Sequence, residues 1–430
     1  MPPVRSVFHA FRNRNLKLLW IGAAASASGF YVGNVVIEWL IYSSTHTALL
    51  LTALGIIEFI PAISIGVVAG ALVDRYDRRH LMIVADTARA AAMGGLAVFV
   101  LVAGFNPVVV LATVFLTATL ASIFNPASSA LLPLIVGKTE LGDSNALLQS
   151  GTTIAGFIGS PLGGALIVTV GVAAGLIYNS ITFAISALTI GLMIIPSILK
   201  ETTEENKESA SSLVSEVKAG LRYLSTQKSL LAMTLTSMVL NFFTFYQLYI
   251  VVYVYNVLHA GATIFGILVG ASAAGFIVGA FMVKHLRTER SPGIWVPAAW
   301  GLGGVPLITL VVFPVIPLAI TGLIAEGFLS ALVSITFTST VQRIVPDEFL
   351  GRYFATNNAG SYAMVPAGIV IGGILIVKFG IGPAFLFSGV GTTVIGLSLL
   401  LSGSIRKWGG MTETSSKPHG EEKESRLTVG

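Results

Sequence analysis

Long apolar stretches recur throughout this chain of 430 residues, and they restrict its possible folds more than any other feature. They run from Leu18 to Leu401, and each is long enough for a helix of roughly 20 residues, the length that crosses the hydrocarbon core of a bilayer. Only 10% of the residues are charged, against about 25% in soluble domains, so the chain could not form a surface that suits water. A β-barrel would show short alternating segments instead. The sequence therefore predicts an all-α membrane protein.

Glycine, proline and charged residues divide the apolar stretches into twelve predicted transmembrane helices. We expect these helices at 18–43, 48–73, 80–104, 107–130, 146–170, 173–199, 229–257, 261–284, 293–314, 317–341, 354–378 and 381–404.

Basic residues are concentrated in alternate loops, which predicts the orientation of the chain. The side that includes the N-terminal segment carries Arg5, Arg12, Arg14, Lys17, Arg75, Arg78, Arg79, Lys138, Lys284, Arg287, Arg290, Arg343, Arg352, Arg406 and Lys407. Lys378 is the one basic residue of the opposite loops. Because positively charged loops stay in the cytoplasm, we expect a multi-pass protein of the plasma (cell) membrane with both termini cytoplasmic.

An internal repeat relates the two halves of the chain at a constant shift of 209 residues. The shift matches glycines in loops and helices, which chance explains poorly, at Gly142/Gly351, Gly151/Gly360, Gly159/Gly368, Gly163/Gly372, Gly164/Gly373 and Gly171/Gly380. Six helices repeated in the same orientation predict two pseudo-symmetric six-helix bundles with a substrate path between them. Transport is therefore the leading function.

The repeat also sets the predicted domain organisation. We expect a cytoplasmic segment at 1–17, bundles at 18–199 and 229–405, a linker at 200–228 and a disordered tail at 406–430. The linker begins with a polar run, and Leu213, Val217, Leu221 and Leu224 then follow at helical spacing, which predicts a short interfacial helix.

A charged motif follows the second predicted helix. Gly70 permits close helix approach, while Asp74 can pair with Arg75, Arg78 and Arg79, so the cluster could latch one conformation. The run resembles the Gly-x-x-x-Asp-Arg-x-x-Arg-Arg signature of the major facilitator superfamily. This resemblance implies the fold of that superfamily, with the motif holding the two halves together on the cytoplasmic side.

The fifth predicted helix carries a second motif, with Gly159, Pro161, Gly163 and Gly164. It resembles the Gly-Pro-x-x-Gly-Gly signature of exporters in this superfamily, although Ser160 takes the usual proline position. A role in helix packing alone is an equal interpretation.

Two further stretches resemble the drug-efflux branch of the superfamily, which contains macrolide-type and siderophore exporters. They are Gln342–Arg352 and Ala85–Ala90. Lysophospholipid transporters are similar enough to stay as an alternative.

Acidic residues within predicted spans are costly and are therefore candidates for function. The 209-residue shift places Glu38 opposite Gln247, and the resemblance implies that their helices line a central cavity, to which Asn34 and Tyr246 could add polar contacts. Because burial favours the neutral form of a carboxyl group, Glu38 could exchange protons near neutral pH. An acid that reaches the outer interface is the alternative interpretation.

Two further acids within predicted spans are also candidates. Glu326 is the second candidate for protonation, with a hydrogen-bonded structural acid as its alternative. Asp86 and Arg89 are three residues apart on one helical face, which favours an internal ion pair over a transport relay.

No cofactor is expected. The chain has no Cys, its six His form no metal-ligand spacing, and it lacks a phosphate-binding loop, so an ion gradient is the expected energy source. We therefore predict a monomeric, proton-coupled exporter of amphipathic small molecules, embedded in lipid and without a nucleic-acid partner. A lysolipid flippase and a non-transporting sensor are the alternatives, and nothing in the sequence indicates an enzyme.

Overall fold

The computed structural model describes residues 13–137, 140–194 and 227–409, together with Arg222, Leu224 and Ser225. These residues form helices and contain no β-strand. Eleven helical stretches are long and apolar enough to cross a membrane, and the apolar stretch Ala48–Ala62 provides the remaining one. The predicted all-α membrane fold with twelve transmembrane helices in two bundles is therefore confirmed.

The first half of the chain forms one bundle of six helices. They are α2 (Arg14–Thr45), α3 (Ala48–Arg75), α4 (Arg78–Ala103), α5 (Pro107–Ile135), α6 (Leu141–Thr169) and α7 (Val172–Gly191). Local sequence signals set several of their starts. The Asn106 side chain accepts hydrogen bonds from the first backbone N–H groups of α5, and Pro107 occupies the first turn, where its missing N–H costs nothing.

The second half forms the other bundle. Its longer helices are α9 (Lys228–Phe242), α10 (Ile250–Asn256), α11 (Ala262–Leu286), α12 (Pro292–Gly303), α13 (Val305–Val312), α14 (Ile316–Ile344), α15 (Asp347–Phe379) and α16 (Ile381–Ser398). Four shorter helices are η3 (Phe243–Gln247), η4 (Thr288–Arg290), η5 (Leu399–Leu401) and α17 (Gly403–Arg406).

Two spans predicted as continuous helices are interrupted. The span at 293–314 breaks between α12 and α13, because Pro306 lacks a backbone N–H and its ring crowds the preceding turn. The span at 229–257 tightens into the 3₁₀ helix η3, and the Ser388 hydroxyl donates to the Phe243 carbonyl at 2.6 Å. Broken helices are tolerated inside membranes where neighbouring groups restore the backbone hydrogen bonds.

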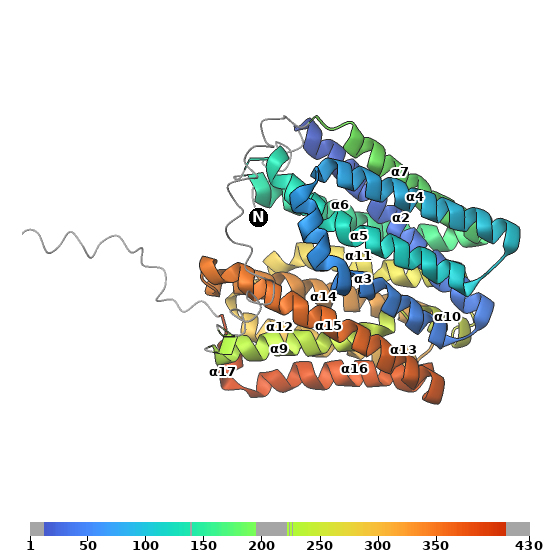
Figure 1. Cartoon of the computed structure of the whole chain (residues 1–430). Helices are drawn as coiled ribbons and strands as arrows, with labels where there is room; N and C mark the ends of the chain where they lie inside the picture. Colours follow the sequence, from blue (N-terminus) through green and yellow to red (C-terminus); the bar gives the residue numbers. More distant parts are fainter. Residues whose placement is uncertain (1–12, 138–139, 195–221, 223, 226, 410–430) are drawn as a thin grey trace, which may run out of the picture.

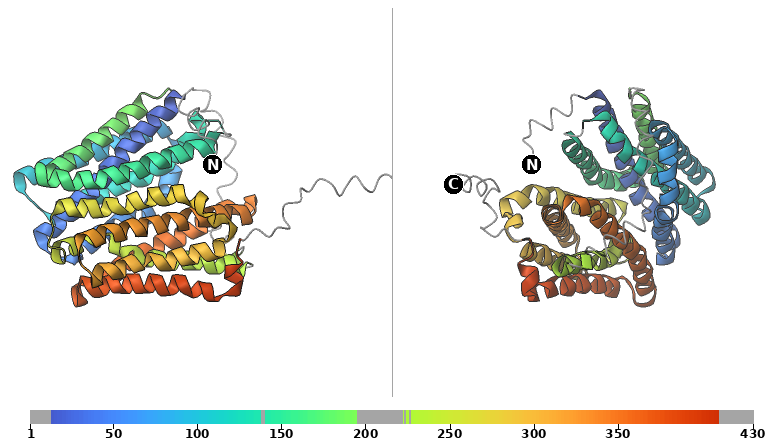
Figure 2. Two further views of the ribbon diagram at one scale, coloured as in Figure 1. Left: turned by 180° about the vertical axis from the view of Figure 1, so that it is seen from behind. Right: turned by 60° about the vertical axis from the view of Figure 1, so that its left-hand side comes forward.

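The two bundles lie side by side with their helices running in the same general direction (Figures 1 and 2). We call the end at which α2 begins and α17 lies the terminal end, which is on the left in Figure 1. The opposite end, which carries α10 and the turns at His46 and Gly104, is the far end.

Glycines allow the two halves to cross closely. α6 packs on α11, and α3 packs on α15, so the fifth and eleventh spans make equivalent contacts with the opposite half. Gly164 lies against the Ala262 carbonyl, and Gly373, its counterpart at the 209-residue shift, lies against Thr52. The duplication inferred from the sequence thus appears as a pseudo-symmetric pair of crossings.

Polar and aromatic contacts close the far end around these crossings. The Asn256 side chain donates to the Tyr42 hydroxyl at 2.6 Å, and the hydroxyls of Thr52 and Tyr249 are 2.8 Å apart. The Trp39 ring stacks on Phe265 from the other half at 6.3 Å. The structure therefore represents a state in which the halves are joined at the far end.

Parts of the predicted domain organisation lie outside the described residues. These are segment 1–12, most of the linker with its predicted interfacial helix, and the tail from residue 410. The start of the tail is described and packed, since the Trp408 ring is 5.7 Å from Phe337 and its side chain is 6% exposed.

The α6–α11 crossing predicts how the halves can be separated. A methyl group at Gly266 would lie 2.5 Å from the Ser160 carbonyl oxygen, so Gly266→Ala should push the two helices apart. Because the chain has no native Cys, spin labels can be attached at Ser44→Cys and His259→Cys, and electron spin resonance should show longer far-end distances. Gly95→Ala, with no atom within 4 Å of the added methyl, is the matched control. An unchanged distance distribution in Gly266→Ala would contradict the prediction.

Candidate functional site

A polar cavity of about 360 Å³ lies within the second half. Its walls come from α9, η3, α12, α13, α14, α15 and α16. The lining combines hydroxyl and amide groups, aromatic rings and a single carboxyl group, at Ser237, Leu240, Asn241, Phe243, Thr244, Tyr246, Ala299, Trp300, Gly303, Leu307, Glu326, Ser330, Val333, Ser334, Phe337, Thr338, Asn357, Ser361 and Thr392. Its volume is at the lower end of the range for small-molecule sites, about 300–1,000 Å³.

One face of α14 supplies the polar stripe of this cavity. Glu326, Ser330, Ser334 and Thr338 follow one another at intervals of four residues, the spacing that places side chains on one side of a helix. The polar residues of this stripe line the cavity, whereas Thr336 pairs with Thr288 and Thr321 bonds to the Pro317 carbonyl of its own helix.

The opposite wall is built by a hydrogen-bonded seam between α9 and α15. The Ser237 hydroxyl donates to the Asn357 side-chain oxygen at 3.0 Å, and the Asn241 amide donates to the Ser361 hydroxyl at 3.3 Å. Each hydrogen bond holds two cavity-lining side chains in place and leaves some of their donors and acceptors free. This wall of the cavity is therefore fixed by bonds within the protein.

Glu326 is held at the edge of the cavity by hydroxyl groups. Ser272 of α11 donates to its carboxylate at 2.7 Å, and Tyr246 of η3 also interacts with it. Among the described residues, Glu326 forms no ion pair with a basic side chain. An acid that is partly buried in a membrane protein without a cation must find a proton or a cationic ligand, or remain costly.

A second acidic site lies in the first half. Glu38 of α2 and Glu58 of α3 are both partly buried and close enough to interact electrostatically. Because like charges repel, two acids that interact in this way are harder to ionise together.

The other residues that the sequence predicted for a central cavity lie in two different halves of the structure. Asn34 lies in α2, one turn before Glu38, and is partly buried. Tyr246 is buried beside Glu326, while its neighbour Gln247 is exposed and interacts with Tyr246. The structure thus brings Tyr246 together with Glu326, and Glu38 together with Glu58.

The charged motif between α3 and α4 makes its described contacts within the first half. Arg79 donates to the carbonyls of Ile190 and Gly191 at the end of α7, and Arg78 donates to the Ala130 carbonyl at 3.4 Å. Guanidinium groups at these carbonyls complement the negative ends of α7 and α5. Arg75 is exposed.

The remaining residues of the charged motif are Gly70 and Asp74, both in α3. Gly70 has no atom within 4 Å of an added methyl group in this state. Asp74 belongs to α3, but its side chain lies outside the described ones.

The glycine motif of α6 faces two partners. Gly159 and Gly163 approach the carbonyls of Ser28 and Val32 in α2 at 3.0 and 3.1 Å, measured from an added methyl group. Gly164 and Pro161 instead contact α11 of the other half, where Pro161 packs on Gly270. The motif therefore connects its own bundle to the crossing between halves.

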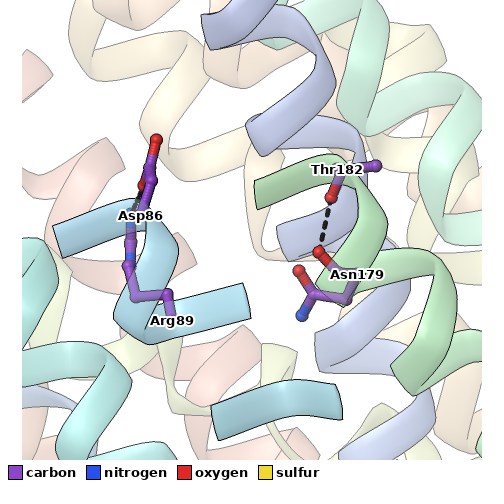
Figure 3. A network of polar contacts seen from close by, with 4 residues as sticks. All are labelled: Asp86, Arg89, Asn179 and Thr182. Atoms are coloured by element: carbon purple, nitrogen blue, oxygen red, sulfur yellow. Dashed lines mark hydrogen bonds and ion pairs between the residues drawn. The ribbon is translucent and has the colours of Figure 1, made fainter. Parts of the chain in front are cut away.

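Asp86 and Arg89 form a buried ion pair on α4, with 3.0 Å between the carboxylate and guanidinium atoms (Figure 3). Asp86 is fully buried, and the Arg89 guanidinium lies over the Phe183 ring at 4.5 Å. Asn179 and Thr182 of α7 lie nearby, where they pack against Gly29 of α2. The pair therefore sits in the core of the first half, on α4 beside α7.

Sequence reasoning missed Glu58 and most of the cavity lining. Glu58 lies in an apolar helix, and its charge alone could have identified it by the rule already applied to Glu38. The four-residue spacing of Ser330, Ser334 and Thr338 behind Glu326 was a readable signal as well. The contribution of α15 was not readable, because it depends on pairing with α9.

Two six-helix bundles that cross at glycines, with polar groups inside, define a membrane transporter rather than an enzyme. The chain matches the family described as transmembrane secretion effector over residues 5–428. It therefore belongs to this family of the major facilitator superfamily.

Relatives carry efflux names, which confirms the resemblance to the efflux branch. The chain is 24% identical over 409 residues to macrolide efflux protein A of Streptococcus pyogenes, and the match covers 92% of this chain and 98% of that relative. It is 20% identical over 409 residues to multidrug efflux pump Tap of Mycolicibacterium fortuitum, with 94% and 98% covered.

Solved structures share the fold. A POT family transporter in complex with 5-aminolevulinic acid matches with a TM-score of 0.69 and 13% identity, covering 91% of this chain and 97% of that one. The nucleoside transporter NupG matches with a TM-score of 0.67 and 12% identity, covering 90% and 98%.

The buried ion pair predicts an asymmetric response to substitution. Asp86→Asn leaves Arg89 charged and unpaired in the core, which should lower the free energy of unfolding by about 3–5 kcal/mol. Replacing both residues, as Asp86→Leu with Arg89→Met, should restore most of that loss because no charge is left buried. Thermal unfolding of the purified proteins in one detergent measures both variants. A double variant that is less stable than Asp86→Asn would contradict this account.

Proposed function

We propose that this transporter exports amphipathic small molecules in exchange for protons. The observation that carries the proposal is a polar cavity inside a membrane bundle whose single carboxyl group has no cationic partner among the described residues, in a state whose halves are joined at the far end. Such a cavity can hold a polar ligand away from lipid while the surrounding rings accept its apolar parts. Relatives named for macrolide and multidrug efflux support this substrate class.

The distribution of charge supports a cytoplasmic terminal end. Arg75, Arg78 and Arg79 lie there, as do Lys284 and Arg287 at the end of α11. Positively charged loops remain in the cytoplasm during insertion. The far end, where the halves are joined in this structure, is then extracellular, and a ligand would enter from the cytoplasm.

Alternating access would follow from rocking of the two bundles. Opening the far end requires the Tyr42–Asn256 and Thr52–Tyr249 hydrogen bonds to break. When the far end is open, Asp74 and Arg78 would latch the two halves together at the terminal end. The latch and the far-end contacts would therefore form in alternate states. Each state is then stabilised by a different set of contacts.

Protons would be exchanged at Glu38 with Glu58, or at Glu326. Protonation removes a charge from a poorly solvated position, so it lowers the cost of enclosing the acid when the bundles close. A ligand that binds better when the acid is deprotonated would cause that acid to release its proton. This competition would couple ligand export to proton import.

Transport in proteoliposomes tests the proposal. With an imposed pH gradient, a fluorescent dye should move against the proton flow in the wild-type protein. Glu38→Gln, Glu58→Gln and Glu326→Gln each remove one charge at nearly constant volume, and at least one should abolish gradient-driven flux. Glu289→Gln, which changes an exposed acid near the terminal end, is the control.

Two outcomes would overturn the proposal. Flux that ignores the gradient in the wild-type protein would favour a facilitator. Translocation of labelled lysolipid without dye flux would favour the lipid-flippase alternative.

Accessibility to a thiol reagent tests the orientation. His259 and Arg287 are exposed, at the far end and near the terminal end respectively. In intact cells, a membrane-impermeant maleimide should label His259→Cys, and should label Arg287→Cys only after permeabilisation. The reverse pattern would place the termini outside.

A further inference from the structure

The polar cavity is a property of one half, although the two halves are repeats. The 209-residue shift maps α14 onto α5 from end to end, from Ile316–Ile344 to Pro107–Ile135. At the matching positions, Thr117 replaces Glu326 and Ala121 replaces Ser330, whereas Asn125 and Ser129 keep polar groups where the second half has Ser334 and Thr338. Thr117 is buried, and its hydroxyl is already bonded to the Val114 carbonyl. Duplication therefore kept the scaffold and changed the lining.

The seam between α9 and α15 shows the same difference. The positions that match Asn241, Tyr246 and Asn357 are occupied by Val32, Ile37 and Leu148. All three replacements are apolar, and Val32 and Ile37 are buried in the main hydrophobic core. Ser237 and Ser361 keep polar counterparts at Ser28 and Thr152, but the amide and phenol groups have none. The first half therefore lacks the carboxyl, amide and phenol groups that distinguish the cavity of the second half.

The charge of the cavity lining determines which sign of ligand charge the cavity favours. Glu326 is its one charged residue, and no Lys, Arg or His is among the lining side chains. An anionic ligand would meet an acid and nothing to neutralise it. Ser272 and Tyr246 bond to Glu326, but as neutral hydroxyl groups they do not neutralise its charge. A cationic ligand would do so.

The remaining groups select the chemistry next to that charge. Within the described part of the chain, Ser330, Ser334 and Thr338 form no hydrogen bond, so their hydroxyls can bind ligand groups that both donate and accept. A ligand that covers these hydroxyls without offering such groups would remove them from water and leave them unpaired, which costs affinity. Trp300 and Phe337, whose rings are 5.8 Å apart, offer an apolar and cation-attracting surface.

We propose that this cavity is a subsite for a protonated amine that carries several hydroxyl groups. Its ammonium group pairs with Glu326, its hydroxyls bind the α14 stripe and the α9–α15 seam, and its apolar part packs on Trp300 and Phe337. The inference rests on the proposed function only in that the occupant is a transport ligand. It assigns recognition to the second half and leaves Glu38 and Glu58 of the first half for proton exchange.

Three probes that differ in one feature at a time test the subsite. N-octyl-N-methylglucamine is a protonated amine with a polyol chain, N-octanoyl-N-methylglucamide has the same polyol without the charge, and N,N-dimethyloctylamine has the charge without hydroxyls. Equilibrium binding is measured in lipid nanodiscs with no gradient, below the micelle-forming concentration of each probe. Wild-type protein should bind the first probe roughly tenfold or more tighter than either of the others, as expected for one charge-assisted hydrogen bond.

Substitutions assign that preference to named groups. Glu326→Gln should abolish the preference for the amine over the amide while binding of the amide is kept, which also shows that the variant is folded. Ser330→Ala combined with Ser334→Ala should abolish the preference for the glucamine over the dimethylamine. Glu289→Gln, an exposed acid near the terminal end, should change neither ratio.

Equal binding of all three probes by the wild-type protein would overturn the proposal, as would an unchanged charge preference in Glu326→Gln. The wild-type comparison decides the matter even if a variant fails to fold. Because no gradient is present, failed proton coupling leaves this result intact. Conversely, gradient-driven flux with no charge preference in binding would reject the subsite and retain the exporter.

Discussion

The absence of water from the bilayer core is the constraint on which the rest of this structure depends. Backbone and side-chain polar groups must find partners within the protein, because lipid offers none. The buried Asp86–Arg89 pair, the Ser388 hydroxyl on the broken seventh span and the hydroxyl cage of Glu326 are three responses to it. Where pairing is incomplete, as in the cavity of the second half, the unpaired groups indicate a ligand rather than a defect.

Close packing follows from the same constraint. Since lipid tails are as apolar as the helices, the halves gain little by hiding apolar surface from each other and depend on close backbone approach. Gly164 and Gly266 provide it at the α6–α11 crossing, and Gly373 and Gly55 provide it at the α3–α15 crossing. The glycine contacts at these two crossings are van der Waals contacts rather than hydrogen bonds. Such contacts suit an interface between halves that must separate and re-form.

Duplication explains how one fold can hold two tasks. The repeated glycines preserve the crossings in both halves, so the scaffold remains pseudo-symmetric. The interior is not symmetric: the first half holds an ion pair and two acids that interact electrostatically, and the second half holds the polar cavity whose one charged residue is Glu326. In the proposed mechanism a proton and a ligand would act on different bundles and still influence one another, because both would bias the same rocking movement.

The sequence by itself determined the membrane class, the number of spans, the repeat and the family resemblance, because hydropathy, glycine spacing and charged loops are local and additive along the chain. It also identified Glu38, Glu326 and the Asp86–Arg89 spacing as costly features. Only the tertiary structure decided which groups interact: Tyr246 with Glu326, and Asn357 and Ser361 with α9, by hydrogen bonds, and Glu38 with Glu58 electrostatically. Those contacts depend on the rotation and breaks of helices packed far apart in sequence, and neither follows from periodicity.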